Sequence, residues 1–90
     1  MKLNPIKANM TEVVFNDKIT ILFSYKTPVA CFNRWRFKVR YVKCFYKTDK
    51  FWSVTTSRHI NQWLRENGID PAKCQTLTQD HLDMIGAQVT

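Results

Sequence analysis

Four cationic side chains alternate with apolar side chains in the middle of this 90-residue chain. Such a period of two is typical of a β-strand with one basic and one apolar face. Side chains on one face repeat about every 6.7 Å, so this strand is predicted to present a row of positive charge to an anion such as a phosphate backbone. The cations are Arg34, Arg36, Lys38 and Arg40, and the apolar residues are Trp35, Phe37, Val39 and Tyr41.

The basic face has a structural and a functional interpretation. Exposed lysine and arginine protect a strand edge against pairing with other molecules. Protection alone does not favour arginine, however, and three of the four cations are arginines, whose planar fork suits phosphate or carboxylate. We therefore predict an anion-binding surface, helped by a cation at the start of a following helix. The candidate binding residues are Arg34, Trp35, Arg36, Lys38, Arg40, Lys43 and Arg58.

The aromatic residues of the same segment leave two alternatives open. Trp35, Phe37 and Tyr41 would form the inner face of a sheet if the segment lies over the core. They would be free to stack on unpaired bases if the segment projects beyond the core.

Positive charge is concentrated in the middle third of the chain, which has a net charge of +7 overall. Residues 31–60 hold eight Lys and Arg but only one acid, Asp49, whereas residues 1–30 have a net charge of +2 and residues 61–90 of −2. A local imbalance of this kind attracts polyanions. Nucleic acid and an acidic protein surface satisfy it equally well.

The residues that could support catalysis do not form a known motif. The acids fall mostly at expected turns or helix starts, and two glycines are too few for a phosphate-binding loop. The cysteines have no metal-binding spacing, and nothing in the pattern links any of them to a histidine. We expect no enzymatic activity, no cofactor and no metal site, with Ser57 as a helix cap and His59 more plausibly structural than part of a site. The cysteines are Cys31, Cys44 and Cys74, and the histidines are His59 and His81.

The fold is predicted to be a single small α+β domain, because strand patterns come first and helix patterns follow. Four antiparallel strands are expected in residues 11–15, 19–25, 29–46 and 51–55, with a turn at residues 16–18 and a break near Asn33. Helices are expected at residues 57–66 and from Thr78 to Gly86, covering one face of the sheet. The core would span about residues 10–66 and a C-terminal helical extension about residues 69–86.

Two stretches resemble a family of small uncharacterised proteins from phages and other mobile elements. They are F-S-Y-K-T-P-V-A at residues 23–30 and Y-K-T-D-K-F-W-S-V-T-T-S-R-H-I-N-Q-W-L at residues 46–64. The resemblance covers about residues 10–66 and implies no activity. Compared with that pattern, residues 33–43 look like an insertion, which places the basic segment in an elongated hairpin arm.

Two functions remain open from the sequence. The first is an accessory protein that contacts nucleic acid through the basic arm. The second is a phage-encoded protein that binds and modulates a host protein, such as a component of a defence system. Both place the chain in the cytoplasm of a host cell, since no segment reaches the roughly 18 apolar residues that cross a membrane. An exposed edge strand also allows a homodimer.

Overall fold

The computed structural model describes residues 2–88, except for the side chains of Trp35, Arg36, Phe37 and Tyr41. It contains one sheet, two α-helices and one 3₁₀ turn. In chain order the elements are β1 (Lys2–Lys7), β2 (Met10–Val14), β3 (Ile19–Ser24), β4 (Thr27–Phe37), β5 (Arg40–Thr48), α1 (Val54–Glu66), η1 (Pro71–Lys73), β6 (Gln75–Leu77) and α2 (Gln79–Ala87).

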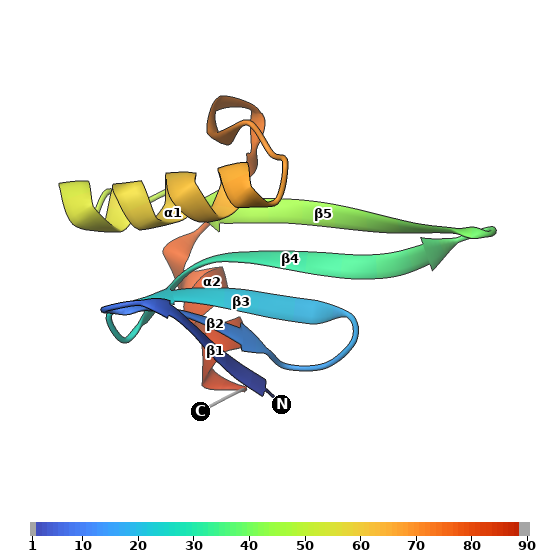
Figure 1. Ribbon diagram of the computed structural model, residues 1–90, viewed down its shortest axis with the longest axis horizontal. Helices are drawn as coiled ribbons and strands as arrows, with labels where there is room; N and C mark the ends of the chain where they lie inside the picture. The colour runs from blue at the N-terminus through green and yellow to red at the C-terminus, as the bar shows by residue number, and fades with distance from the viewer. Residues whose placement is uncertain (1, 89–90) are drawn as a thin grey trace.

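The six strands of the sheet are ordered as they occur in the chain, from β1 to β6. The first five form an antiparallel meander, and β6 pairs in parallel with β5 after the crossover through α1. The predicted turn between β2 and β3 is present: the side-chain oxygen of Asn16 accepts hydrogen bonds from the N–H groups of Lys18 and Ile19. Figure 1 shows the meander, with the β4–β5 hairpin extending beyond the other strands.

The helix α1 forms where apolar periodicity predicted a helix. Ile60, Trp63 and Leu64 make up its buried stripe, and Gly68 follows its end with a left-handed φ of 78°. It begins at Val54, three residues before the expected start, because the Ser53 side chain accepts a hydrogen bond from the N–H of Thr56. The prediction of Ser57 as the cap is therefore wrong, since Ser57 lies inside the helix. The predicted strand over residues 51–55 is therefore wrong.

The two helices cover opposite faces of the sheet, whereas cover on one face was expected. Alternate residues of β3 separate the two cores: Leu22 packs in the cluster of α1, and Ile21 packs in the cluster of α2. Trp63 and Leu64 fill the first cluster, and Leu82 fills the second. Because side chains alternate across a strand, the result is a layer of sheet between two helices.

The helix α2 starts as predicted and ends differently. The Thr78 side chain accepts a hydrogen bond from the N–H of His81, and Asp80 lies in the first turn. Leu82 is buried in this helix, whereas Met84 is 68% exposed. Gly86 does not end the helix. It lies inside it, where an added Cβ would approach Pro28 Cγ to 2.8 Å, so glycine here permits close packing of α2 on the sheet.

The sheet has six strands where four were expected. The segment expected as one strand at residues 29–46 forms β4 and β5, residues 51–55 form no strand, and two short segments join the edges of the sheet. β1 pairs with β2 at one edge, and β6 pairs with β5 at the other. The long strand segment does not break near Asn33. β4 continues to Phe37, and the chain turns at Lys38, which has a φ of 57°.

Candidate functional site

Residues 34–43 form a hairpin arm that leaves the sheet, and we call this segment the basic arm. Its base is fixed on one side, where the N–H of Arg34 donates to the carbonyl of Lys18 at 2.6 Å. The pairing of β3 with β4 ends at Asn33, and the pairing of β5 with β6 starts only at Tyr46. Within residues 2–88, strand pairing of residues 35–37 and 40–42 is therefore confined to the hairpin itself. The arm projects to the right in Figure 1.

The turn position distributes the cations over both faces of the arm. Arg34 pairs with Lys43 and follows Phe32, which packs against Trp63, so both cations lie on the α1 face. Arg40 pairs with Phe37 and falls at the alternate position, on the α2 face. The predicted single row of four cations on one strand is therefore wrong. Because the chain turns at Lys38, Arg34 lies on β4 and Arg40 lies on β5.

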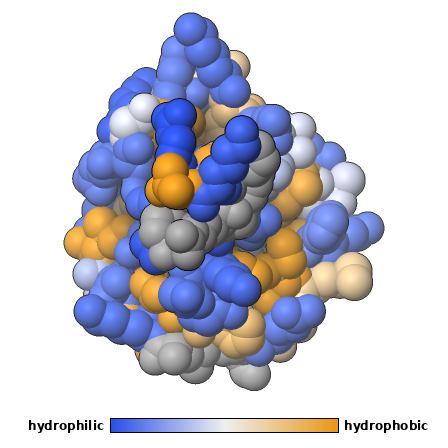
Figure 2. All heavy atoms as spheres, turned by 90° about the vertical axis from the view of Figure 1, so that its right-hand side faces the viewer, coloured by the Kyte–Doolittle hydropathy of each residue, from blue (hydrophilic) through white to orange (hydrophobic). Residues whose placement is uncertain are grey.

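The tip of the arm is fully open to solvent. Lys38, Val39 and Arg40 are all exposed, with Val39 at 87%. Figure 2 looks onto this end of the molecule and shows a small apolar spot with hydrophilic side chains beside it. The roles predicted for Trp35 and Arg36 concern side chains that lie outside the described part of the structure.

Of the two remaining predicted cations, Lys43 belongs to the arm and Arg58 lies far from it. Lys43 is exposed, with its Nζ atom 5.1 Å from the centre of the Phe32 ring. Arg58 is exposed in the first half of α1, and the start of this helix lies away from the arm (Figure 1). The structure thus does not bring Arg58 to the arm.

A groove at the base of the arm adds a cation that the sequence pattern did not reveal. It has a volume of about 220 Å³ and lies between residues 43–45 of β5 and residues 69 and 73–75. Phe45, Ile69 and Cys74 give it an apolar floor, and Lys43 and Lys73 are its charged residues. Lys73 is thirty positions away from Lys43 in the chain, so no local pattern could have paired them.

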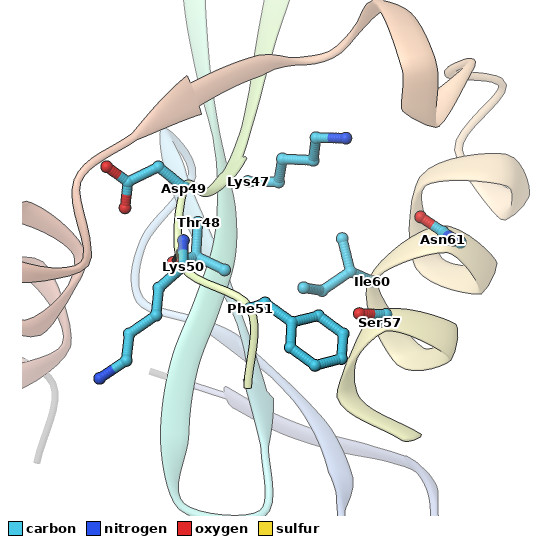
Figure 3. Close-up of a pocket in the computed structure, with 8 residues that line it drawn as sticks. All are labelled: Lys47, Thr48, Asp49, Lys50, Phe51, Ser57, Ile60 and Asn61. Carbon is cyan, nitrogen blue, oxygen red and sulfur yellow. Dashed lines mark hydrogen bonds between the residues drawn. The ribbon is translucent and has the colours of Figure 1, made fainter. Parts of the chain in front are cut away.

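A second shallow groove, of about 200 Å³, lies between the end of β5 and the start of α1. Figure 3 shows Phe51 facing α1 beside Ser57 and Ile60. The Lys47 ammonium is held there by the carbonyl of Pro71 at 2.7 Å. Its one other cation, Lys50, stands beside Asp49 in the chain, so this groove does not concentrate one sign of charge.

The polar residues closest to a catalytic arrangement are buried under α1. Ser24 Oγ lies 2.8 Å from His59 Nδ1 and 3.0 Å from Thr56 Oγ1. The exposed fractions of Ser24 and His59 are only 1% and 4%, which closes this cluster to a substrate. Burial, together with the charge of Lys7, lowers the pKa of His59. The histidine is hydrogen-bonded in the core, as its structural interpretation requires.

The buried cysteine Cys31 is separated from that histidine by the sheet. It belongs to the α2 cluster, whereas His59 lies under α1. Burial raises the pKa of the Cys31 thiol to about 11, which makes it a poor nucleophile at neutral pH. The structure thus does not bring this cysteine and this histidine together.

The described residues also lack two features, a metal-binding cluster and a membrane-spanning helix. No group of three or more His, Cys, Asp or Glu side chains is placed to hold a metal ion there. No helix among residues 2–88 combines the length and the apolar character needed to cross a membrane.

Fold and site together define a small protein with a sheet between two helices and a basic hairpin arm. A family model matches residues 1–80, and the chain belongs to that family, a family of unknown function designated DUF8033. Comparison with curated proteins and with solved structures finds no significant match.

Proposed function

We propose that this chain is a non-enzymatic binding protein that contacts nucleic acid through the basic arm. One observation carries the proposal: the arm leaves the sheet and holds five cations and no acid in residues 34–43. A segment with five cations and no acid in its own sequence attracts a polyanion, and binding releases the polyanion's counterions.

The distribution of charge over both faces supports a ribbon-like contact. A two-stranded ribbon fits a DNA major groove, where phosphates line both walls. With the arm in the groove, the exposed side chains of Lys43 on one face and Arg40 on the other would each contact the phosphates of one wall. Phosphate contacts carry no base sequence, so we propose binding that is independent of sequence.

A salt titration tests this function. Affinity for a fluorescent duplex, followed by anisotropy from about 50 to 200 mM salt, should fall steeply. The tip variant Lys38→Gln with Arg40→Gln should bind more weakly and reduce the salt slope by about two, or roughly one per cation. Absent binding at low salt, or affinity unaffected by salt, contradicts the proposal.

Matched controls separate the arm from general basicity. Lys2→Gln with Lys26→Gln removes two exposed cations from other parts of the chain, and its slope should stay that of the unmodified protein. Arg58→Gln should also leave binding unchanged, because Arg58 belongs to the first half of α1, and the start of this helix lies away from the arm (Figure 1). If the controls lose as much affinity as the tip variant, the arm is not the site.

The outer edge of β5 favours a second candidate, a phage-encoded protein that binds a host protein in the cytoplasm and modulates it. Outside Tyr46–Thr48 this edge has no paired strand within residues 2–88, and an open edge accepts strands from other proteins. A tagged chain should then recover one stoichiometric partner from nuclease-treated host lysate. Loss of that partner on nuclease treatment would instead support contact through nucleic acid.

A further inference from the structure

The outer edge of β5 offers backbone groups in a defined direction. The Phe45 carbonyl accepts a hydrogen bond from Cys74 Sγ at 3.4 Å, so it points away from β4. Backbone groups alternate in direction along a strand, which also directs the N–H and C=O of Lys43 and Tyr41 outward. β6 pairs only from Tyr46 onward, so within residues 2–88 no strand covers this stretch.

The groove beside this edge has the chemistry of a side-chain pocket. Its floor consists of Phe45, Ile69 and Cys74, and the last two of these are partly buried against the α1 core. Among the described residues that line the groove, Lys43 and Lys73 are charged and none is an acid. Such a groove fits one apolar side chain with carboxylates on either side.

The positive charge near the outer edge of β5 favours one kind of binding partner over others. A second copy of the chain would place β5 against β5 and bring two basic arms together, which like-charge repulsion opposes. An acidic strand meets Arg40, Lys43 and Lys73 with opposite charge. A nucleic acid satisfies the charge but has no backbone N–H and C=O groups to continue the ladder.

We propose that the outer edge of β5, with the groove beside it, binds an extended acidic segment of a partner protein as an added strand. Main-chain hydrogen bonds to Tyr41 and Lys43 supply the pairing, and the groove accepts an apolar side chain. Carboxylates on the segment pair with Lys43 and Lys73. The inference rests on the second candidate function, binding of a host protein at the edge of β5, and shares Lys43 and Arg40 with the proposed nucleic-acid contact. Main-chain pairing at Tyr41 and Lys43 and the charge of Lys73 test the inference, whereas Lys38 and Arg40 test the nucleic-acid contact.

A capped peptide of alternating Glu and Val is the probe. Its addition should protect the amide protons of Tyr41 and Lys43 from hydrogen exchange, as followed by NMR. The same peptide N-methylated on every second residue keeps its charge but loses donors, so it should bind at least about ten-fold more weakly. Equal binding of the two peptides overturns the proposal.

Protein variants test the charged part of the site. Lys43→Gln with Lys73→Gln should weaken peptide binding about ten-fold at low salt, and Lys2→Gln with Lys26→Gln should not. Protection of the two amides that rises with protein concentration without peptide would identify a second copy as the occupant and overturn the inference. Protection by a single-stranded oligonucleotide, with none from the peptide, would do the same.

Discussion

The hairpin of β4 and β5 is built in opposite ways at its two ends. At its base Ala30, Cys31 and Phe45 are buried between two helices, while at its tip Lys38 and Arg40 are exposed. The base is held by two cores, and strand pairing of the tip is confined to the hairpin. We therefore expect the base of the hairpin to contribute to folding and its tip to contribute to binding. Changes at the base should alter folding stability, and changes at the tip should alter binding.

The largest effect is expected from Trp63, which anchors α1 to the base. Its ring lies 6.0 Å from Phe32 and 5.7 Å from Phe45, and its Nε1 donates to Glu12 at 3.0 Å. Trp63→Ala should lower the free energy of unfolding by about 3–5 kcal/mol, a large part of the roughly 5–15 kcal/mol of a typical domain. Urea denaturation followed by circular dichroism measures this loss.

A second substitution separates the ring from its hydrogen bond. Trp63→Phe keeps most of the aromatic contact and leaves Glu12 without this donor, so it should cost about 1–3 kcal/mol. A loss under about 1 kcal/mol for Trp63→Ala would show that the base does not depend on this packing.

The next effect is expected on the other face, at Gln79. Its Oε1 accepts hydrogen bonds from the side chains of Thr48 and Trp52, and its Nε2 donates to the Pro28 carbonyl and to Asp83. Gln79→Ala leaves these groups unpaired and should cost about 1–3 kcal/mol of unfolding free energy. The exposed control Gln75→Ala should stay within about 0.5 kcal/mol. If both variants are equally stable, the hydrogen bonds of Gln79 do not stabilise the packing of α2 on the sheet.

The parts of the fold that sequence predicts well are those fixed by local patterns. The apolar stripe of α1, the Thr78 cap and the Asn16 turn each follow from a few neighbouring residues. The edge strand β1 was not predicted because its sequence is largely polar and contains Pro5. It is a strand because it pairs with β2. The role of Gln79 depends on partners far away in the chain, which no local pattern contains.

The basic arm, too, was predicted only as far as local sequence patterns allow. Its charge was predictable from residues 34–43, and its hairpin arm was implied by the family resemblance, but the faces were not predictable. Tight hairpin turns need a positive φ, for which glycine or asparagine is the usual signal, and here Lys38 takes a φ of 57°. Because side chains alternate, the turn position decides which face each cation occupies. An expected break near Asn33 therefore put Arg40 on the wrong strand and face.

A smaller effect at the base should depend on pH through His59. Burial lowers the pKa of this histidine in the folded protein, so below the ordinary value of about 6.5 the unfolded chain binds the extra proton more readily. The stabilising contribution of neutral His59 is thus present above about pH 6.5 and is lost as pH falls through the folded pKa. Unfolding free energies measured from pH 7.5 to 5.5 should fall, and His59→Gln should flatten that fall.

A control for the pH experiment is the exposed histidine, replaced as His81→Gln. Both variants remove one imidazole, and only His59 bonds to Ser24 in the core. If His59→Gln retains the full pH dependence, the buried cluster is not its source.

The smallest effect on stability is expected at the tip. Lys38→Gln with Arg40→Gln changes two exposed side chains at the turn of the hairpin, so the free energy of unfolding should change by no more than about 0.5 kcal/mol. Phe45→Ala, on the same hairpin but at its buried base, should cost about 3–5 kcal/mol. A tip variant that loses more than about 1 kcal/mol would mean that the arm contributes to folding. Unchanged stability with weakened binding would instead assign the arm to contact with a partner, because its cations then contribute to association and not to the fold.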